Sequence, residues 1–233
     1  MLEILHEDNH CLVVNKPAGL LAQGDSSGDE SLITRTKAYL KERYRKPGNV
    51  FVGLVHRLDR PTSGAVVLAK TSKGASRLSE QFRSGTIRKI YWAVVEGKPS
   101  PDAGEWLDRL EKDRRVNRVH VVADDSDADD SDGNDLTGQE ARVSYRRLES
   151  AGRYSLIELT PKTGRGHQLR VQLASRGLPI VGDRKYGSRI LVPASDGGSR
   201  ILLHAREICF NHPTSRQAIS VTAPVPADWS WPL

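Results

Sequence analysis

The sequence is poor in cysteine, with only Cys11 and Cys209 among its 233 residues. Two cysteines cannot form the disulfide framework on which many small secreted domains depend. Both lie in apolar, strand-like segments, where a thiol is usually buried and unreactive. We therefore expect two buried structural thiols and a protein of the reducing cytoplasm.

Long apolar runs are absent as well. No segment approaches the roughly 18 consecutive apolar residues that a membrane-spanning helix needs. The N-terminal sequence MLEILHEDNH has neither the basic region nor the apolar stretch of a secretory signal. We expect no membrane partner and a cytoplasmic location.

Motifs for metals and cofactors are also missing. The seven histidines are scattered, and His6 and His10 lie on opposite sides of a predicted turn, which disfavours a shared zinc ion. There is no GxSxG motif, and the glycines after Lys162 do not have the spacing of a phosphate-binding P-loop. The acidic run DDSDADDSDGND lacks the glutamate that completes an EF-hand loop. We expect no metal and no cofactor.

The charge is distributed unevenly along the chain. The net charge is +6, and removing the seven aspartates between Asp124 and Asp135 leaves +13 on the rest. Such a balance favours a polyanionic partner whose phosphates the chain neutralises, although a solvated basic surface is the simpler alternative. The segment 124–138 has low hydrophobicity and charge of one sign, so we expect a disordered loop within a single domain spanning 1–233.

Periodicity predicts a mixture of strands and helices. Amphipathic spacing predicts a helix between Asp29 and Lys46, capped by Asp29 or Ser31, and a second helix capped by Ser72 and ending near Gly85. Apolar or alternating runs predict strands, with a hairpin at the N-terminus and another at the C-terminus. The predicted strands lie in 3–17, 51–55, 65–69, 86–97, 116–122, 141–148, 154–159 and 202–226.

The stretch GLVHRLDRPTSG, residues 53–64, holds one carboxylate, Asp59, on a polar turn between two of these strands. Arg57 and Arg60 flank it, and nearby positive charge favours the ionised carboxylate. Pro61 and Gly64 restrict the backbone of the turn. A turn held together by salt bridges is the simpler interpretation of an isolated Asp–Arg pair.

A second charged stretch, LTPKTGRGHQLR, ends in a predicted helix from His167 to Arg176. His167 and Arg170 are three residues apart, so both project from one side of its first turn. The helix N-terminus and Arg165 together favour an anion. Arg170 alone is equally consistent with a surface salt bridge.

Together these stretches resemble the motifs of the RluA-type family of RNA pseudouridine synthases. HRLDRPTSG resembles the motif with the catalytic aspartate, NKPAGL the first motif, KIYWA the second, and LTPKTGRGHQLR the third. The resemblance runs from about residue 4 to 229. Residues 21–25 depart from it, because the family usually has a histidine there. The N-terminal accessory RNA-binding domain that many members carry is not part of the resemblance, so we expect RNA affinity to come from the catalytic domain or from partners.

The resemblance implies an α+β fold, with a mixed, mostly antiparallel bent sheet, flanking helices and a central RNA-binding cleft. It implies isomerisation of uridine to pseudouridine in ribosomal or transfer RNA without a cofactor, and we expect a monomer. A non-catalytic RNA-binding or ribosome-assembly factor that retains the fold is the alternative.

The resemblance also implies roles for individual residues. Asp59 would be the catalytic residue, as a nucleophile or as a base, and Arg170 would pair with it. Tyr91 would lie in the active site, although a strand tyrosine is more often a core residue; beside the substrate it could stack on a flipped base. The expected RNA contacts are Arg57, Arg60, Lys16, Lys162, Arg165 and His167, with a structural role as the alternative for Lys16.

Overall fold

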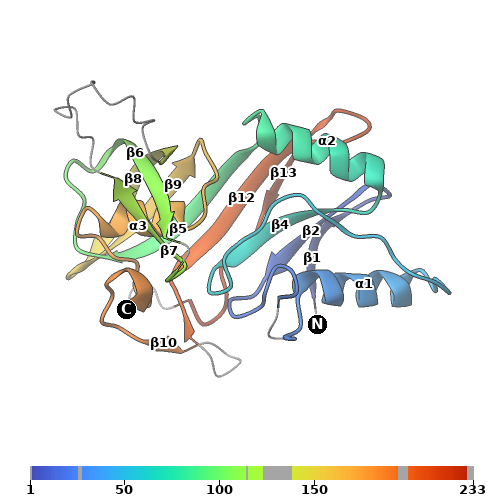
Figure 1. The fold of residues 1–233 in the computed structure, drawn as a ribbon, viewed down its shortest axis with the longest axis horizontal. Coiled ribbons are helices and arrows are strands. Elements are labelled where there is room, and N and C mark those ends of the chain that lie inside the picture. The colour runs from blue at the N-terminus through green and yellow to red at the C-terminus, as the bar shows by residue number, and fades with distance from the viewer. Residues whose placement is uncertain (1, 26–27, 114, 123–137, 194–198, 230–233) are drawn as a thin grey trace.

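The computed structural model describes residues 2–25, 28–113, 115–122, 138–193 and 199–229. The predicted α+β class is confirmed, because the chain folds into a mixed, mostly antiparallel sheet flanked by helices (Figure 1). The helices are α1 (Leu32–Arg43), α2 (Ser72–Arg83), α3 (Gln168–Ala174) and the short 3₁₀ helix η2 (Arg184–Tyr186). None of the helices in these ranges has the length and apolar character needed to cross a membrane.

The main sheet has eleven strands, nine of which run in the order β1-β2-β4-β12-β5-β9-β8-β6-β7, while β13 pairs with β12 and β3 with β4. A small second sheet pairs β10 with β11. The strands of the first half of the chain are β1 (Glu3–Glu7), β2 (Cys11–Lys16), β3 (Gly53–Leu54), β4 (Ser63–Ala69), β5 (Arg88–Glu96), β6 (Ala103–Asp113) and β7 (Arg118–Val122). Those of the second half are β8 (Gln139–Ala151), β9 (Tyr154–Pro161), β10 (Val192–Pro193), β11 (Ser199–Arg200), β12 (Leu203–Asn211) and β13 (Ala218–Thr222).

Strand β12 joins two halves of the sheet, as Figure 1 shows. On one side of it lie β1, β2, β3 and β4, which we call the N-half; on the other lie β5, β9, β8, β6 and β7, the C-half. Strand β4 pairs with β12 in parallel and only briefly, through Ser63 and Gly64. Gly64 has φ +117, and a Cβ atom there would lie 2.4 Å from the carbonyl oxygen of Ala205. The junction of the halves therefore requires glycine at this position.

Apolar clusters cover both faces of the N-half. Leu78 of α2 packs on one face with Val67 and Ile208, and Leu32 of α1 packs on the other with Val66 and Leu68. In the C-half, the buried Leu169 and Leu173 of α3 join a third cluster with residues of β5, β8 and β9. The short helix α3 is thereby fixed against the C-half.

The helix caps agree only in part with the predictions. Ser31 is one of the two residues predicted to cap α1. It does so, because its side chain accepts a hydrogen bond from the backbone N–H of Thr34 at 3.2 Å. The cap of α2 is Thr71 and not Ser72, because the Thr71 hydroxyl accepts from the N–H of Gly74 at 3.0 Å.

Several other predictions need correction. Strand β6 was missed, because the inward-facing Asp108 interrupts its apolar alternation; that carboxylate is held by Gln172 and Arg176 of the α3 region. The strand predicted over 51–55 contains only the two residues of β3. Cys209 is half-buried and not buried, whereas Cys11 is fully buried. The acidic loop predicted over 124–138 falls almost wholly on residues 123–137, which lie outside the described residues.

His204 of β12 ties the junction to the end of β13. It is fully buried, its Nδ1 lies 2.9 Å from the Ser63 hydroxyl, and its Nε2 lies 3.2 Å from the carbonyl oxygen of Ala223. Burial lowers the pKa of His204 to about 4, and the charge of Arg206 adds to this effect. The imidazole is therefore neutral at pH 7.

We expect the free energy of unfolding to fall as the pH falls from about 6.5 to about 4. In that window an unfolded histidine binds a proton and the folded His204 does not, so acid favours the unfolded state. The slope of stability against pH should be shallower in the His204→Gln variant, by up to about 1.4 kcal/mol per pH unit. Urea unfolding between pH 4.5 and pH 7 measures both slopes; equal slopes would contradict the assignment.

Candidate active site

Asp59 lies on the turn between β3 and β4. The backbone carbonyl of Asp59 accepts a hydrogen bond from the N–H of Thr62 at 3.0 Å, and the neighbouring Leu58 is buried. These contacts fix the turn to the body of the protein. The Asp59 side chain is 29% exposed, so the carboxylate is both anchored and accessible.

Arg170 reaches Asp59 from α3, as the resemblance implied. Its Nη1 lies 2.8 Å from Asp59 Oδ2, although the two residues are 111 positions apart. The Arg170 side chain is 6% exposed, so this contact is not a surface salt bridge. A charge-assisted hydrogen bond of this kind orients the carboxylate as well as balancing its charge.

The residue that orients Arg170 is not among those predicted from the sequence. Asp183 comes directly after a short turn that contains Gly182, and its two carboxylate oxygens lie 2.6 Å and 2.9 Å from Nε and Nη2 of Arg170. Burial alone would lower the pKa of Arg170, but the hydrogen bonds and charge of Asp183, with help from Asp59, raise it. The guanidinium is held by two carboxylates and stays charged.

Tyr91 of β5 lines the same pocket as Asp59 and Arg170. Its ring also packs against two of the apolar clusters. One part of the Tyr91 side chain therefore belongs to the core, and another part lines the pocket. Burial raises the pKa of Tyr91, and the charge of Asp59 raises it further. The phenol is therefore protonated at neutral pH.

His167 does not belong to α3, contrary to the predicted helix from His167 to Arg176. It is the cap residue, in the left-handed conformation with φ 55, and the helix spans only Gln168–Ala174. The His167 Nε2 atom lies 3.9 Å from Asp59 Oδ2, and its Nδ1 lies 2.7 Å from the hydroxyl of Tyr186. The imidazole of His167 therefore lies between Asp59 and Tyr186.

The basic turn before α3 is shaped by Gln168. Its Oε1 accepts hydrogen bonds from the Thr163 hydroxyl at 2.8 Å and from the N–H of Arg165 at 3.1 Å. Lys162 and Arg165 are exposed on this turn. Lys89, which the sequence analysis did not single out, also reaches it and donates to the Thr163 carbonyl at 3.3 Å.

A pocket, which we call the main pocket, is lined by Asp59, Tyr91, Lys89, His167 and Arg170 among others. It shares residues with two grooves. The first, the α2-side groove, is lined by Phe82, Arg83, Lys162 and Arg165, together with Tyr91 and Arg57. The second, the β7-side groove, is lined by Gln23, Lys112 and Val119, together with His167 and Arg57. The exposed Arg57 thus lines all three hollows.

The expectation that Lys16 contacts an RNA phosphate is contradicted by its burial. Lys16 is 0% exposed, and its Nζ donates to the carbonyl oxygens of Leu20 at 2.8 Å and Arg60 at 3.2 Å, and also to that of Pro17. Burial lowers the pKa of Lys16 to about 7, while the charge of Asp59 opposes this effect. Lys16 braces the turn that carries Asp59. Arg60 itself pairs with Asp29 at 2.9 Å, at the rim of the β7-side groove.

Replacing Lys16 by Met should lower the free energy of unfolding by about 2–4 kcal/mol, because buried carbonyl oxygens lose their donor. Turnover should fall as well, since the Arg60 carbonyl is next to Asp59 in the chain. Chemical denaturation measures the first effect. The matched control is Lys41→Met on the exposed face of α1, which should change stability by less than about 0.5 kcal/mol. A Lys16→Met variant as stable as this control would contradict the bracing role.

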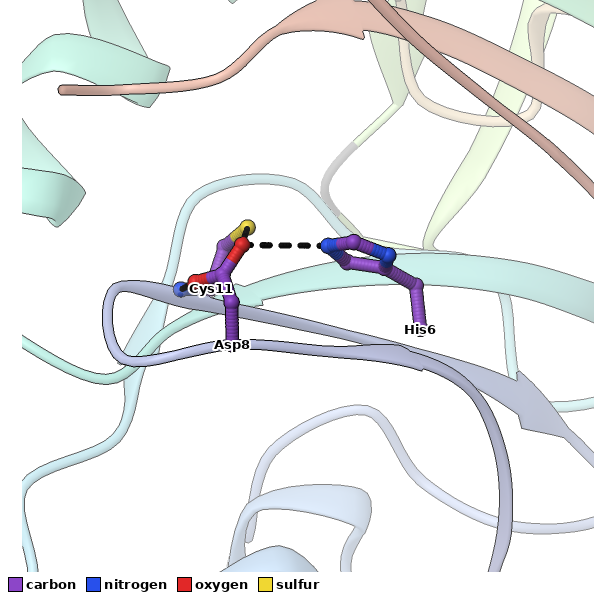
Figure 2. A group of neighbouring side chains, drawn as sticks. All are labelled: His6, Asp8 and Cys11. Atoms are coloured by element: carbon purple, nitrogen blue, oxygen red, sulfur yellow. Dashed lines mark hydrogen bonds and ion pairs between the residues drawn. The ribbon is translucent and has the colours of Figure 1, made fainter. Parts of the chain in front are cut away.

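A second group of polar side chains lies at the β1–β2 turn, where Figure 2 shows His6, Asp8 and Cys11 facing one another. Asp8 Oδ1 accepts hydrogen bonds from the N–H groups of His10 and Cys11, and Oδ2 lies 3.1 Å from His6 Nε2 and 3.2 Å from His212 Nε2.

A hydrogen-bond donor and an acceptor can be assigned to the contacts that His212 and Cys11 make with Asp8. His212 Nδ1 accepts the N–H of Ser215 at 2.9 Å, so Nε2 carries the proton that it donates to Asp8. Burial raises the pKa of the Cys11 thiol, which donates to Asp8 at 3.3 Å, whereas a metal ligand would be a thiolate. We interpret the group as a connection between the β1–β2 turn and the β12–β13 turn.

Comparison with known proteins adds independent findings. A family profile described as RNA pseudouridylate synthase matches residues 10–175. An uncharacterized RNA pseudouridine synthase of Synechocystis sp. is 34% identical, covering 97% of this chain and 66% of that protein. The tRNA pseudouridine synthase C of Yersinia pestis is 35% identical, covering 98% of this chain and 88% of that protein. The ribosomal large subunit pseudouridine synthase C of Vibrio vulnificus is 32% identical, covering 95% of this chain and 65% of that protein.

The fold has a counterpart among solved structures. Human RNA Pseudouridylate Synthase Domain Containing 4 superimposes with a TM-score of 0.76 at 26% identity, covering 97% of this chain and 90% of that one. The chain spans about two thirds of the length of several of the curated relatives, such as 66% of the Synechocystis protein.

Proposed function

The chain belongs to the RluA-type family of RNA pseudouridine synthases, and on that premise we propose that it isomerises specific uridines to pseudouridine in structured ribosomal or transfer RNA. The observation that carries the proposal is the Asp59–Arg170 contact of 2.8 Å in a pocket shared with Tyr91. Relatives named for both ribosomal and transfer RNA support either substrate.

The isomerisation breaks the bond between uracil N1 and ribose C1′, turns the base, and joins C5 to C1′. The proton of C5 is lost and N1 gains one, so no atoms are added overall. Asp59 acts either by attacking C1′ or by removing a proton from C2′. Arg170, itself held by Asp183, fixes Asp59 Oδ2, and no described residue donates to Oδ1, which leaves this oxygen available to the substrate.

A base paired in RNA cannot reach a pocket of this kind, so the target uridine is flipped out at a cost of a few kcal/mol. The uracil stacks on Tyr91, where stacking contributes about 1–3 kcal/mol. Because the Tyr91 phenol is protonated, it can donate a hydrogen bond during proton movement but is not a ready base. Arg57, at the meeting point of the main pocket and both grooves, occupies the vacated space or holds the displaced backbone.

The remaining cations bind phosphates that flank the target. Lys162 and Arg165 do so along the α2-side groove, and Arg60 at the rim of the β7-side groove. Lys89 joins them, because its ammonium lies between the main pocket and the α2-side groove.

We also propose that residues 1–233 form one catalytic domain that acts as a monomer in the cytoplasm. A single sheet that contains both β1 and β13 supports one domain. A site in which Asp59, Tyr91 and Arg170 come from the same chain supports a monomer.

The test is release of tritium from ribosomal and transfer RNA transcripts made with 5-tritiated uridine. Tritium appears in water only when the proton at C5 is lost, so the purified chain should release it. Chemical mapping of pseudouridine in RNA from cells with and without the gene then identifies the target. A chain that binds the transcripts but releases no tritium would be the non-catalytic RNA-binding factor.

A further inference from the structure

His167 occupies an unusual backbone position beside the reactive carboxylate. Its left-handed φ of 55 costs a residue other than glycine on the order of 1 kcal/mol. The conformation places the imidazole between the main pocket and the buried Tyr186, with 17% of the side chain exposed. Strain retained at a pocket is frequently connected with function.

The protons around Tyr186 determine which nitrogen of His167 carries hydrogen. Tyr186 is 4% exposed, and its hydroxyl oxygen accepts the N–H of Val119 at 3.0 Å. Its own O–H then needs an acceptor, and among the described residues His167 Nδ1, at 2.7 Å, is the one at hydrogen-bonding distance. A buried hydroxyl without an acceptor would cost about 1–3 kcal/mol. Nδ1 therefore accepts, and Nε2 carries the proton.

The imidazole is neutral and its remaining N–H is directed at the pocket. Burial lowers the pKa of His167, and the charges of Arg170 and Lys185 add to this effect against those of Asp59 and Asp183. The distance of 3.9 Å from Nε2 to Asp59 Oδ2 is too long for a hydrogen bond. Among the described residues, the Nε2–H of His167 therefore has no acceptor, although it lies beside Asp59.

His167 and Tyr91 flank Asp59 on different sides. Tyr91 is shared between the main pocket and the α2-side groove, whereas His167 is shared between the main pocket and the β7-side groove. If the uracil stacks on Tyr91, His167 faces the sugar. Asp59 acts at C1′ or C2′, and in both cases the 2′-oxygen of the ribose is within two bonds of that atom.

We propose that Tyr186 is a positioning residue that holds His167 as the neutral Nε2–H tautomer, and that this N–H donates to the 2′-oxygen of the flipped uridine. The inference rests on the proposed function and extends it to recognition of the sugar. The 2′-hydroxyl is the group by which a protein distinguishes RNA from DNA.

The tautomer can be tested without RNA. Two-bond ¹H–¹⁵N correlation spectra of protein labelled with ¹⁵N-histidine distinguish the two neutral forms, and the His167→Asn spectrum identifies the signals of His167. We expect the Nε2–H form at pH 7 in the wild type, and a shift towards the Nδ1–H form in Tyr186→Phe. An Nδ1–H form or an imidazolium in the wild type would overturn the proposal, whether or not the variants fold.

The sugar contact is tested with two synthetic RNA hairpins that carry the mapped target as uridine or as 2′-deoxyuridine. For the wild type, kcat/KM should be about 10-fold lower on the deoxy target, the loss of one hydrogen bond. His167→Asn tolerates the left-handed backbone but is too short to donate, so it should lose about 10-fold on the uridine hairpin and little more on the deoxy hairpin. His167→Gln, whose amide reaches further, should recover part of the loss.

The outcomes separate this inference from the proposed function. Equal losses in wild type and His167→Asn on changing to the deoxy hairpin would overturn the sugar contact, while the proposed function would stand. A wild type inactive on the uridine hairpin and on transcripts would overturn the proposed function and the sugar contact with it. The spectra decide the tautomer in either case.

Discussion

Replacing Asp59 with Asn should reduce tritium release by about 10⁴-fold while RNA binding is retained. An amide has neither the negative charge needed to attack C1′ nor the basicity needed to deprotonate C2′. It still offers Arg170 a carbonyl oxygen at nearly the same position, so the architecture of the pocket should be preserved. The loss should therefore appear in kcat, with little change in the dissociation constant of the RNA.

Single-turnover tritium release and filter binding measure the two effects. The matched control is Asp102→Asn, which changes an exposed aspartate that pairs with Arg147 on the surface. It should leave both quantities within about twofold of the wild type. If Asp59→Asn retained a tenth or more of the wild-type rate, Asp59 would have no part in the chemistry.

Replacing Arg170 with Lys should lower kcat by about 10²-fold, although the charge is conserved. Lysine offers a single ammonium, which cannot bind both oxygens of Asp183 and Asp59 Oδ2 in the geometry of the planar guanidinium. Misplacement of a catalytic group by about 1 Å is enough for a loss of this size. The buried Asp183 would also lose one of its hydrogen bonds, so stability should fall by about 3–5 kcal/mol.

The loss of rate must be separated from the loss of stability. Turnover is measured at a temperature at which circular dichroism shows the Arg170→Lys protein to be folded. The matched control is Arg146→Lys, which alters an exposed pair with Glu158; it should match the wild type in both stability and rate. A folded Arg170→Lys enzyme with wild-type kcat would show that the pairing with Asp59 does not contribute to catalysis.

Asp59 and Arg170 could be predicted from the sequence better than the residues that hold the site in place. Asp59 and Arg170 stand in two charged motifs, and the pairing implied by the resemblance is confirmed at 2.8 Å. Asp183 and Tyr186 lie in short Gly-containing turns, where an aspartate and a tyrosine are ordinary turn residues. Only Asp183 had an indirect signal, because a buried arginine on an apolar helix needs a buried carboxylate partner.

The other differences between prediction and structure arise because charged side chains are buried. Lys16 was expected at the surface because lysine is rarely buried, but three carbonyl oxygens converge on its ammonium. Asp108 hid strand β6 because a carboxylate on the inner face breaks the apolar alternation by which strands are recognised. A distant segment supplies both partners of Asp108 and one of the three carbonyl oxygens around Lys16, and no local pattern records these contacts.

The two sides of the Asp59–Arg170 contact belong to different halves of the sheet, which meet at the short pairing of β4 with β12. Neither half alone contains a competent enzyme, because each supplies one partner of this contact. During renaturation, turnover should therefore return no earlier than the far-ultraviolet signal. Regain of catalysis would report the final docking of the halves, and until then the reactive acid would lack the cation that orients it.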